Sequence, residues 1–170
     1  MVEHPRYVRS STEDAISTCL RLRPSVLILD AEPLLIDWSA PDGAWNSRWH
    51  EVLSRSVDQG VGVVVVVTNS RRDLSGLIQP SPDHGMSVRL VRRARKPWTT
   101  RRALGLPAVA GRGVVCGDVS LTDGLLATRL GFTFVHVQAE DPPPLARLQN
   151  SCGRLLALVF GSRQFPGWRG

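Results

Sequence analysis

The sequence predicts an α/β protein built on a five-stranded parallel sheet, because short apolar runs alternate with segments of helical spacing. Five runs are expected to be strands: Val26–Leu29, Gly62–Val67, Ser87–Val91, Val114–Cys116 and Phe132–Val137. The run that ends at Val67 is continuous and β-branched, which is typical of a parallel strand buried on both faces. Strands that alternate with helices join through right-handed crossovers, so we expect all five strands to run parallel.

Helical segments are expected between these strands. Ser10-Ser11-Thr12-Glu13 has the pattern of a capping box, and the apolar residues that follow it, from Ala15 to Leu20, have helical spacing. Further helices are expected over Trp49–Val57, from about Arg71, over Thr99–Leu104, over Thr122–Leu130 and over Leu145–Phe160.

One domain is expected for a chain of 170 residues, with a core over about residues 5–140 and a basic, apolar C-terminal helix over about residues 145–160. Apolar residues make up 42% of the chain, which suffices for an ordinary core, and the longest apolar run, Val61–Val67, is far too short to cross a bilayer. The N-terminus lacks the layout of a signal sequence, and the three cysteines form no CxxC pair. We therefore expect a cytoplasmic protein without a disulfide framework or a zinc site.

The chain is basic, with a formal net charge of +6 and a pI of about 10.5. This balance favours anionic partners, which include phosphorylated substrates, nucleic acid and an anionic membrane surface. A solvated basic face is an equally good interpretation of the surface arginines. Nucleic acid is the least favoured partner, because the chain has no aromatic-basic RNA motif and no recognisable DNA-reading element.

Acidic side chains follow two of the expected strands. Asp30 and Glu32 come directly after the first strand, and Asp118 and Asp123 follow the fourth. The carboxyl ends of parallel strands meet at one edge of a sheet, where ligands bind in open α/β folds. Mg²⁺ prefers oxygen ligands in octahedral geometry. Asp30, Glu32, Asp118 and Asp123 are therefore candidate ligands of Mg²⁺, an ion that can clamp a phosphate and offset its charge.

Cleavage of a phosphate ester needs a nucleophile, charge neutralisation and a proton donor. Asp30 is the candidate nucleophile, acting through an aspartyl-phosphate. Thr68 and Asn69, at the end of the second strand, are candidates to bind the phosphoryl group, and Lys96 is the candidate to neutralise its charge. Glu32 is the candidate acid that protonates the leaving group and the base that then activates water.

Each of these residues also has a plain structural interpretation when it is taken alone. Asp30 or Thr68 could cap a helix or end a strand, Lys96 could be a solvated surface lysine, and Asp123 would suit the first turn of a helix. Their shared placement at strand ends favours the functional interpretation. The histidines, including His136 in the last expected strand, lack metal-ligand spacing and are interpreted as incidental.

In this order the motifs resemble those of the haloacid dehalogenase (HAD) superfamily. Asp30-Ala31-Glu32 corresponds to its motif I, Thr68-Asn69 to motif II, Lys96 to motif III, and Gly117-Asp118 through Asp123 to motif IV. The resemblance covers about Pro5 to Val137. More narrowly, the chain is similar to the YqeG-like, phosphatidylglycerophosphatase-like branch of subfamily III, on the basis of Pro5-Arg6-Tyr7-Val8-Arg9-Ser10, Asp37-Trp38, Lys96-Pro97 and the run Gly117–Gly124.

The resemblance implies a three-layer Rossmann-like sandwich with strand order 3-2-1-4-5, a site above strands 1 and 4, and Mg²⁺-dependent phosphatase chemistry. No long insert separates the motifs, so no large cap domain is expected and an open site would admit a bulky substrate. Related proteins of this branch include phosphatidylglycerophosphate phosphatases. Contact of the C-terminal segment Arg147–Arg169 with an anionic membrane is therefore an alternative to its packing on the sheet.

Two features depart from the family's pattern. Its phosphatases usually carry Asp two residues after the nucleophile, where this chain has Glu32, and the extra methylene displaces the acid by about 1 Å. The usual Asn-Thr that follows is replaced by Pro33-Leu34, which removes a hydroxyl. These departures motivate an alternative function, in which a HAD-like module binds Mg²⁺ or a phosphorylated ligand as a sensor or partner protein.

Overall fold

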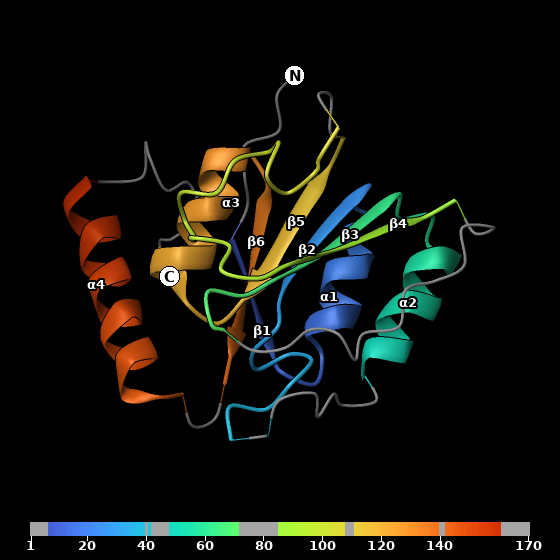
Figure 1. Ribbon diagram of the computed structural model, residues 1–170. Helices are drawn as coiled ribbons and strands as arrows, with labels where there is room; N and C mark the ends of the chain where they lie inside the picture. Colours follow the sequence, from blue (N-terminus) through green and yellow to red (C-terminus); the bar gives the residue numbers. More distant parts are fainter. Residues whose placement is uncertain are drawn as a thin grey trace.

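A six-stranded parallel sheet forms the centre of the computed structural model (Figure 1). The strands are β1 (Tyr7–Ser11), β2 (Val26–Asp30), β3 (Val63–Val67), β4 (Ser87–Val91), β5 (Gly113–Gly117) and β6 (Thr133–Gln138). Their order across the sheet is β1-β6-β5-β2-β3-β4. The structure describes residues 7–39, 41, 48–71, 85–107, 111–139 and 142–160, and the side chains of these residues up to residue 153.

The expected number of five strands was wrong, because β1 adds a sixth strand at the edge beside β6. The order therefore differs from the expected 3-2-1-4-5 by this added edge strand. The sequence of β1, Tyr-Val-Arg-Ser-Ser, contains no continuous apolar run, and most of its residues are only half-buried or exposed. An edge strand pairs on one side only, so its main-chain hydrogen bonds stabilise it without the apolar pattern of a central strand.

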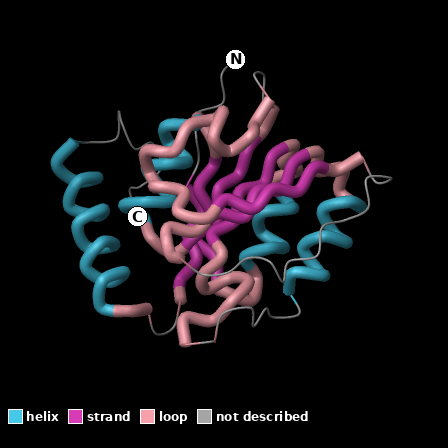
Figure 2. The backbone as a smooth tube through the Cα atoms, in the orientation of Figure 1, coloured by secondary structure: helices cyan, strands magenta, loops and turns pink. Residues whose placement is uncertain are grey.

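Helices cover both faces of the sheet, as Figures 1 and 2 show. The described helices are α1 (Ala15–Arg21), α2 (Arg48–Asp58), α3 (Leu125–Leu130) and α4 (Pro144–Phe160). Side chains of β2 alternate between the faces: Leu27 and Leu29 pack with α1 and α2, whereas Val26 and Ile28 pack with α3. This alternation confirms an α/β, Rossmann-like arrangement of layers.

Three expectations for helices need correction. Thr99–Leu104 forms turns, because Gly105, with a φ of 65°, and Pro107 end the segment after about one turn. The stretch Thr122–Leu130 divides into a π-helical turn, Ser120–Gly124, and α3. The capping box expected over Ser10–Glu13 is displaced by one residue: the Ser11 hydroxyl donates to Oδ2 of Asp14 and accepts from the Asp14 amide before α1. The helix expected from about Arg71 lies outside the described residues.

Within the described part of the chain, no helix combines the length and apolar character that crossing a bilayer requires. The C-terminal helix expected over residues 145–160 is present as α4. Most of the basic, apolar segment proposed for membrane contact lies outside the described side chains.

Substituting Gly113→Ala is expected to destabilise the fold by about 1–3 kcal/mol, because the new methyl would overpack the core. A Cβ at Gly113 would lie 2.3 Å from Cδ1 of Phe132, which is buried beneath β5. Gly62→Ala is the matched control, since its Cβ would meet only Ser25 O at 3.5 Å. Urea denaturation of both variants measures the difference. Equal stability of the two variants would contradict the packing described here.

Candidate metal and phosphate site

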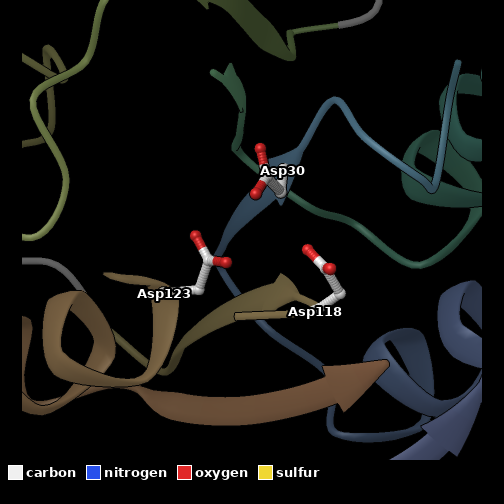
Figure 3. A group of neighbouring side chains, drawn as sticks. All are labelled: Asp30, Asp118 and Asp123. Carbon is white, nitrogen blue, oxygen red and sulfur yellow. The ribbon is translucent and has the colours of Figure 1, made fainter. Parts of the chain in front are cut away.

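Three carboxylates meet at the carboxyl edge of the sheet (Figure 3). Asp30 ends β2, Asp118 follows β5, and Asp123 lies in the π-helical turn. One oxygen from each lies within 4.8 Å of the others, and the three residues are only 6%, 1% and 0% exposed. Neighbouring parallel strands β2 and β5 bring Asp30 and Asp118 together, as their positions at strand ends predicted.

Gly117 makes room for the third carboxylate. A Cβ at this position would lie 2.4 Å from Oδ2 of Asp123, so only glycine permits such close approach of the strand and this side chain. The same Oδ2 accepts a hydrogen bond from the Val119 amide at 3.3 Å. The turn after β5 therefore directs Asp123 back toward the end of the strand.

Lys96 supplies a buried positive charge to the cluster. Its Nζ lies 2.5 Å from Oδ2 of Asp30 and 2.8 Å from Oδ1 of Asp123. The lysine side chain is 3% exposed, so these ion pairs are shielded from water. When all four groups are ionised, three carboxylates and one ammonium leave a net charge of −2. One divalent cation would balance this charge.

The loop after β4 holds Lys96 inward while its neighbours point outward. Arg93 and Arg95 have positive φ angles of 50° and 55°, a conformation that non-glycine residues seldom adopt and that concentrates at functional sites. Both arginines are exposed, whereas Ala94 and Lys96 are buried. Asn69 completes the arrangement, since its Oδ1 accepts from the Lys96 amide at 2.8 Å and its Nδ2 donates to the Lys96 carbonyl at 3.2 Å.

This geometry gives Asn69 a positioning contact. It was expected to bind substrate directly, but both atoms of its amide group engage the backbone of Lys96. Direct contact between Asn69 and a substrate stays a prediction.

Burial and mutual repulsion perturb the acids. Burial, and then the charge of Asp123, raise the pKa of Asp30 well above its ordinary value even though Lys96 opposes the change. Burial and Asp123 likewise raise the pKa of Asp118 to about 7. Burial alone would lower the pKa of Lys96, but the carboxylates of Asp123 and Asp30 outweigh it and raise that pKa. Ionised acids are therefore unfavourable here without a further positive charge.

Asp118 gives the clearest indication that the site binds a cation. Neither of its carboxylate oxygens has a hydrogen-bond partner among the described residues, although both are buried. A buried carboxylate without a partner is costly, because it has lost water and gained nothing in return. The donor set of three carboxylates fits a hard divalent cation such as Mg²⁺.

Glu32 and Thr68 form the second part of the site. The Thr68 hydroxyl donates to Oε2 of Glu32 at 2.9 Å, and the Ser70 hydroxyl donates to Oε1 at 2.9 Å. Glu32 and Thr68 are 4% and 1% exposed. These contacts bring the ends of β2 and β3 together. After burial and the charge of Asp123, the charge of Glu32 also raises the pKa of Asp118. Its expected role as a metal ligand stays a prediction.

Sequence reasoning missed the residues that hold the Asp118 loop and the hydroxyl beside Glu32. His136 was interpreted as incidental, but it is buried and its Nε2 lies 3.0 Å from the Asp118 carbonyl oxygen. Asn150 of α4 also bonds this loop, and Ser70 binds Glu32. A polar residue within the apolar strand β6, beside the motif in β5, was the available signal for His136. No sequence signal links α4 to this loop.

A cavity of about 350 Å³ opens beside Asp118, between the end of β6 and α4. Its lining includes the polar side chains of Gln138, Arg147 and Asn150.

A scan against models of protein families, a search of curated proteins and a search of solved structures each found no match to this chain. Function is therefore inferred from the geometry and chemistry of the site.

Asp118→Asn is expected to stabilise the metal-free protein at pH 8. Burial and Asp123 raise the pKa of Asp118 from 3.8 to about 7 in the folded protein. The contribution of Asp118 to the free energy of unfolding is therefore full below about pH 4 and is lost as the pH rises through about 7. The neutral isostere avoids this loss, which amounts to at most about 4 kcal/mol. Denaturation in EDTA at pH 4 and pH 8 measures the effect.

The stability difference between Asp118→Asn and the wild type should appear at pH 8 and vanish at pH 4. Added Mg²⁺ should stabilise the wild type more than the variant. Asp58→Asn, at an exposed position that ends α2, is the control for a surface charge. If Asp118→Asn and the wild type were equally stable at pH 8, burial of the ionised Asp118 carboxylate would not be unfavourable as described.

Proposed function

We propose that this protein is a Mg²⁺-dependent phosphohydrolase of the HAD type that cleaves phosphate monoesters through an aspartyl-phosphate on Asp30. The observation that carries the proposal is the buried group of three carboxylates around one lysine, in which the carboxylate oxygens of Asp118 have no hydrogen-bond partner among the described residues. Asp30, Asp118 and Asp123 would hold the ion. When bound, Mg²⁺ would offset the negative charge of the phosphate.

Asp30 would act as the nucleophile. Its Oδ2 is paired with Lys96, whereas Oδ1 makes no bond to the described residues and is available to attack phosphorus. Formation of the bond between Asp30 and phosphorus would break the ester bond, and the electron pair would leave on the ester oxygen. Lys96 would hold Asp30 in orientation and offset charge on the phosphoryl oxygens.

Glu32 and Thr68 would complete the reaction. Glu32, as the acid, would give a proton to the leaving oxygen, and as the carboxylate it would then take a proton from the water that hydrolyses the aspartyl-phosphate. The Thr68 hydroxyl, now bonded to Glu32, would orient this side chain or turn to a phosphoryl oxygen.

A basic surface near Lys96 supports an anionic substrate. Arg93, Arg95 and Arg129 are exposed, and Trp98, two residues after Lys96, is 72% exposed with the Arg129 guanidinium 5.3 Å from its ring centre. Positive charge beside a site raises the local concentration of phosphorylated molecules.

Asp30→Asn is expected to lower Mg²⁺-dependent phosphate release by about 10³-fold or more, because the amide cannot form the aspartyl-phosphate. The assay measures phosphate from an aryl phosphate, sugar phosphates, nucleotides and phosphatidylglycerophosphate, which separates soluble from membrane substrates. Asp58→Asn is the control at an exposed acid and should retain wild-type release. Unchanged turnover in Asp30→Asn would refute the nucleophile. Release of no phosphate by the wild type would favour the second function.

The second function is a HAD-like module that binds Mg²⁺ or a phosphorylated ligand with little turnover. One observation favours it: both carboxylate oxygens of Glu32 accept hydroxyl hydrogen bonds, from Thr68 and Ser70. These two hydrogen bonds restrain Glu32, which would oppose its movement toward a leaving group. In such a module the acid would serve to join the ends of β2 and β3.

Glu32→Asp distinguishes the two functions. If Glu32 is the working acid and base, shortening it by one methylene should lower phosphate release by about 10²-fold, since a displacement of about 1 Å misplaces the proton. If the module has lost turnover through Glu32, the same change should raise release. Glu13→Asp, at an exposed position before α1, is the matched control.

A further inference from the structure

The backbone of Asp118 is held from two sides. Its carbonyl oxygen accepts a hydrogen bond from Nδ2 of Asn150 at 2.9 Å and lies 3.0 Å from Nε2 of His136. A carbonyl can only accept, so Nε2 of His136 carries the proton in this contact. The other ring nitrogen, Nδ1, lies 2.6 Å from the Tyr7 hydroxyl, so the ring is fixed at both ends.

Asn150 also bonds the next part of the loop. Its Oδ1 accepts from the Ser120 amide at 2.8 Å, while its Nδ2 donates to the Asp118 carbonyl. One side-chain amide thus spans the backbone on both sides of Val119. The carbonyl oxygen of Asp118 therefore has two partners, whereas its carboxylate has no hydrogen-bond partner among the described residues.

The inner face of α4 is built around this contact. Ala146, Asn150 and Gly153 are spaced for one side of a helix, and a Cβ at Gly153 would lie 3.1 Å from Cβ of Ser120. Leu145 and Leu148, on another side of the helix, are 65% and 61% exposed. Docking of α4 and the position of Asp118 therefore depend on the same short stretch of backbone.

We propose that α4 acts as a clamp on the metal loop, with Asn150 as the positioning residue that orients Asp118 for the divalent cation. The inference rests on the proposed function, since it names what supports the metal ligand of that site. Partners that orient a ligand from outside the coordination sphere usually contribute 10- to 100-fold in metal affinity. Binding of the cation and docking of α4 are then coupled, and each strengthens the other.

The test is calorimetric titration of Mg²⁺ into the metal-free full-length chain. Asn150→Ala should weaken Mg²⁺ binding by about 10- to 100-fold, because the Asp118 backbone loses one of its two donors. Asn150→Leu, which keeps the volume of the side chain and loses both hydrogen bonds, should show the same loss. Gln149→Ala is the matched control, since it removes an amide from the same turn of α4 that makes no described hydrogen bond.

The unfolding temperature in EDTA separates positioning from simple support of the fold. Clamping predicts weaker Mg²⁺ binding at 20 °C by variants that are still folded there. Wild-type Mg²⁺ affinity in folded Asn150→Leu, whether or not its unfolding temperature falls, would overturn the clamp and leave the phosphohydrolase intact. A wild type that binds no Mg²⁺ would overturn both.

Discussion

Burial of three carboxylates against a single ammonium is the constraint on which the rest of this structure depends. Lys96 forms ion pairs with Asp30 and Asp123, but the carboxylate oxygens of Asp118 have no hydrogen-bond partner in the described part of the chain. Two unusual local features serve this group: glycine at 117 admits Asp123, and the left-handed residues Arg93 and Arg95 beside Lys96 turn it inward. Native proteins concentrate such local exceptions at functional sites.

The same group of carboxylates lowers the stability of the metal-free protein. Without a cation, repulsion and burial raise the pKa values of Asp30 and Asp118, so the ionised site opposes folding. A purely structural core would replace such acids with apolar residues at little cost or with a gain in stability. Their presence beside a buried lysine supports the proposal of a ligand that carries positive charge.

The sequence predicted those parts of the fold and site that follow from position along a strand. The proximity of Asp30 and Asp118 could be predicted because an apolar run precedes each of them and parallel strands end at one edge of the sheet. Edge strand β1 was missed because its pairing, and not an apolar run, stabilises it. Asn150 and His136 were missed because their roles depend on packing between segments distant in the chain. A role of Glu32 as a metal ligand stays a prediction, and its hydrogen bonds with Thr68 and Ser70 could not be read from the sequence.

We propose that Asp30, Asp118 and Asp123 together hold one divalent cation. Mn²⁺ takes the same oxygen ligands as Mg²⁺ and scatters X-rays anomalously, so crystals grown with Mn²⁺ would locate the ion. We expect one anomalous peak in contact with all three carboxylates, including the oxygens of Asp118 that have no hydrogen-bond partner in the described structure. Crystals saturated with Mn²⁺ that show no peak among these carboxylates would rule out this cation site.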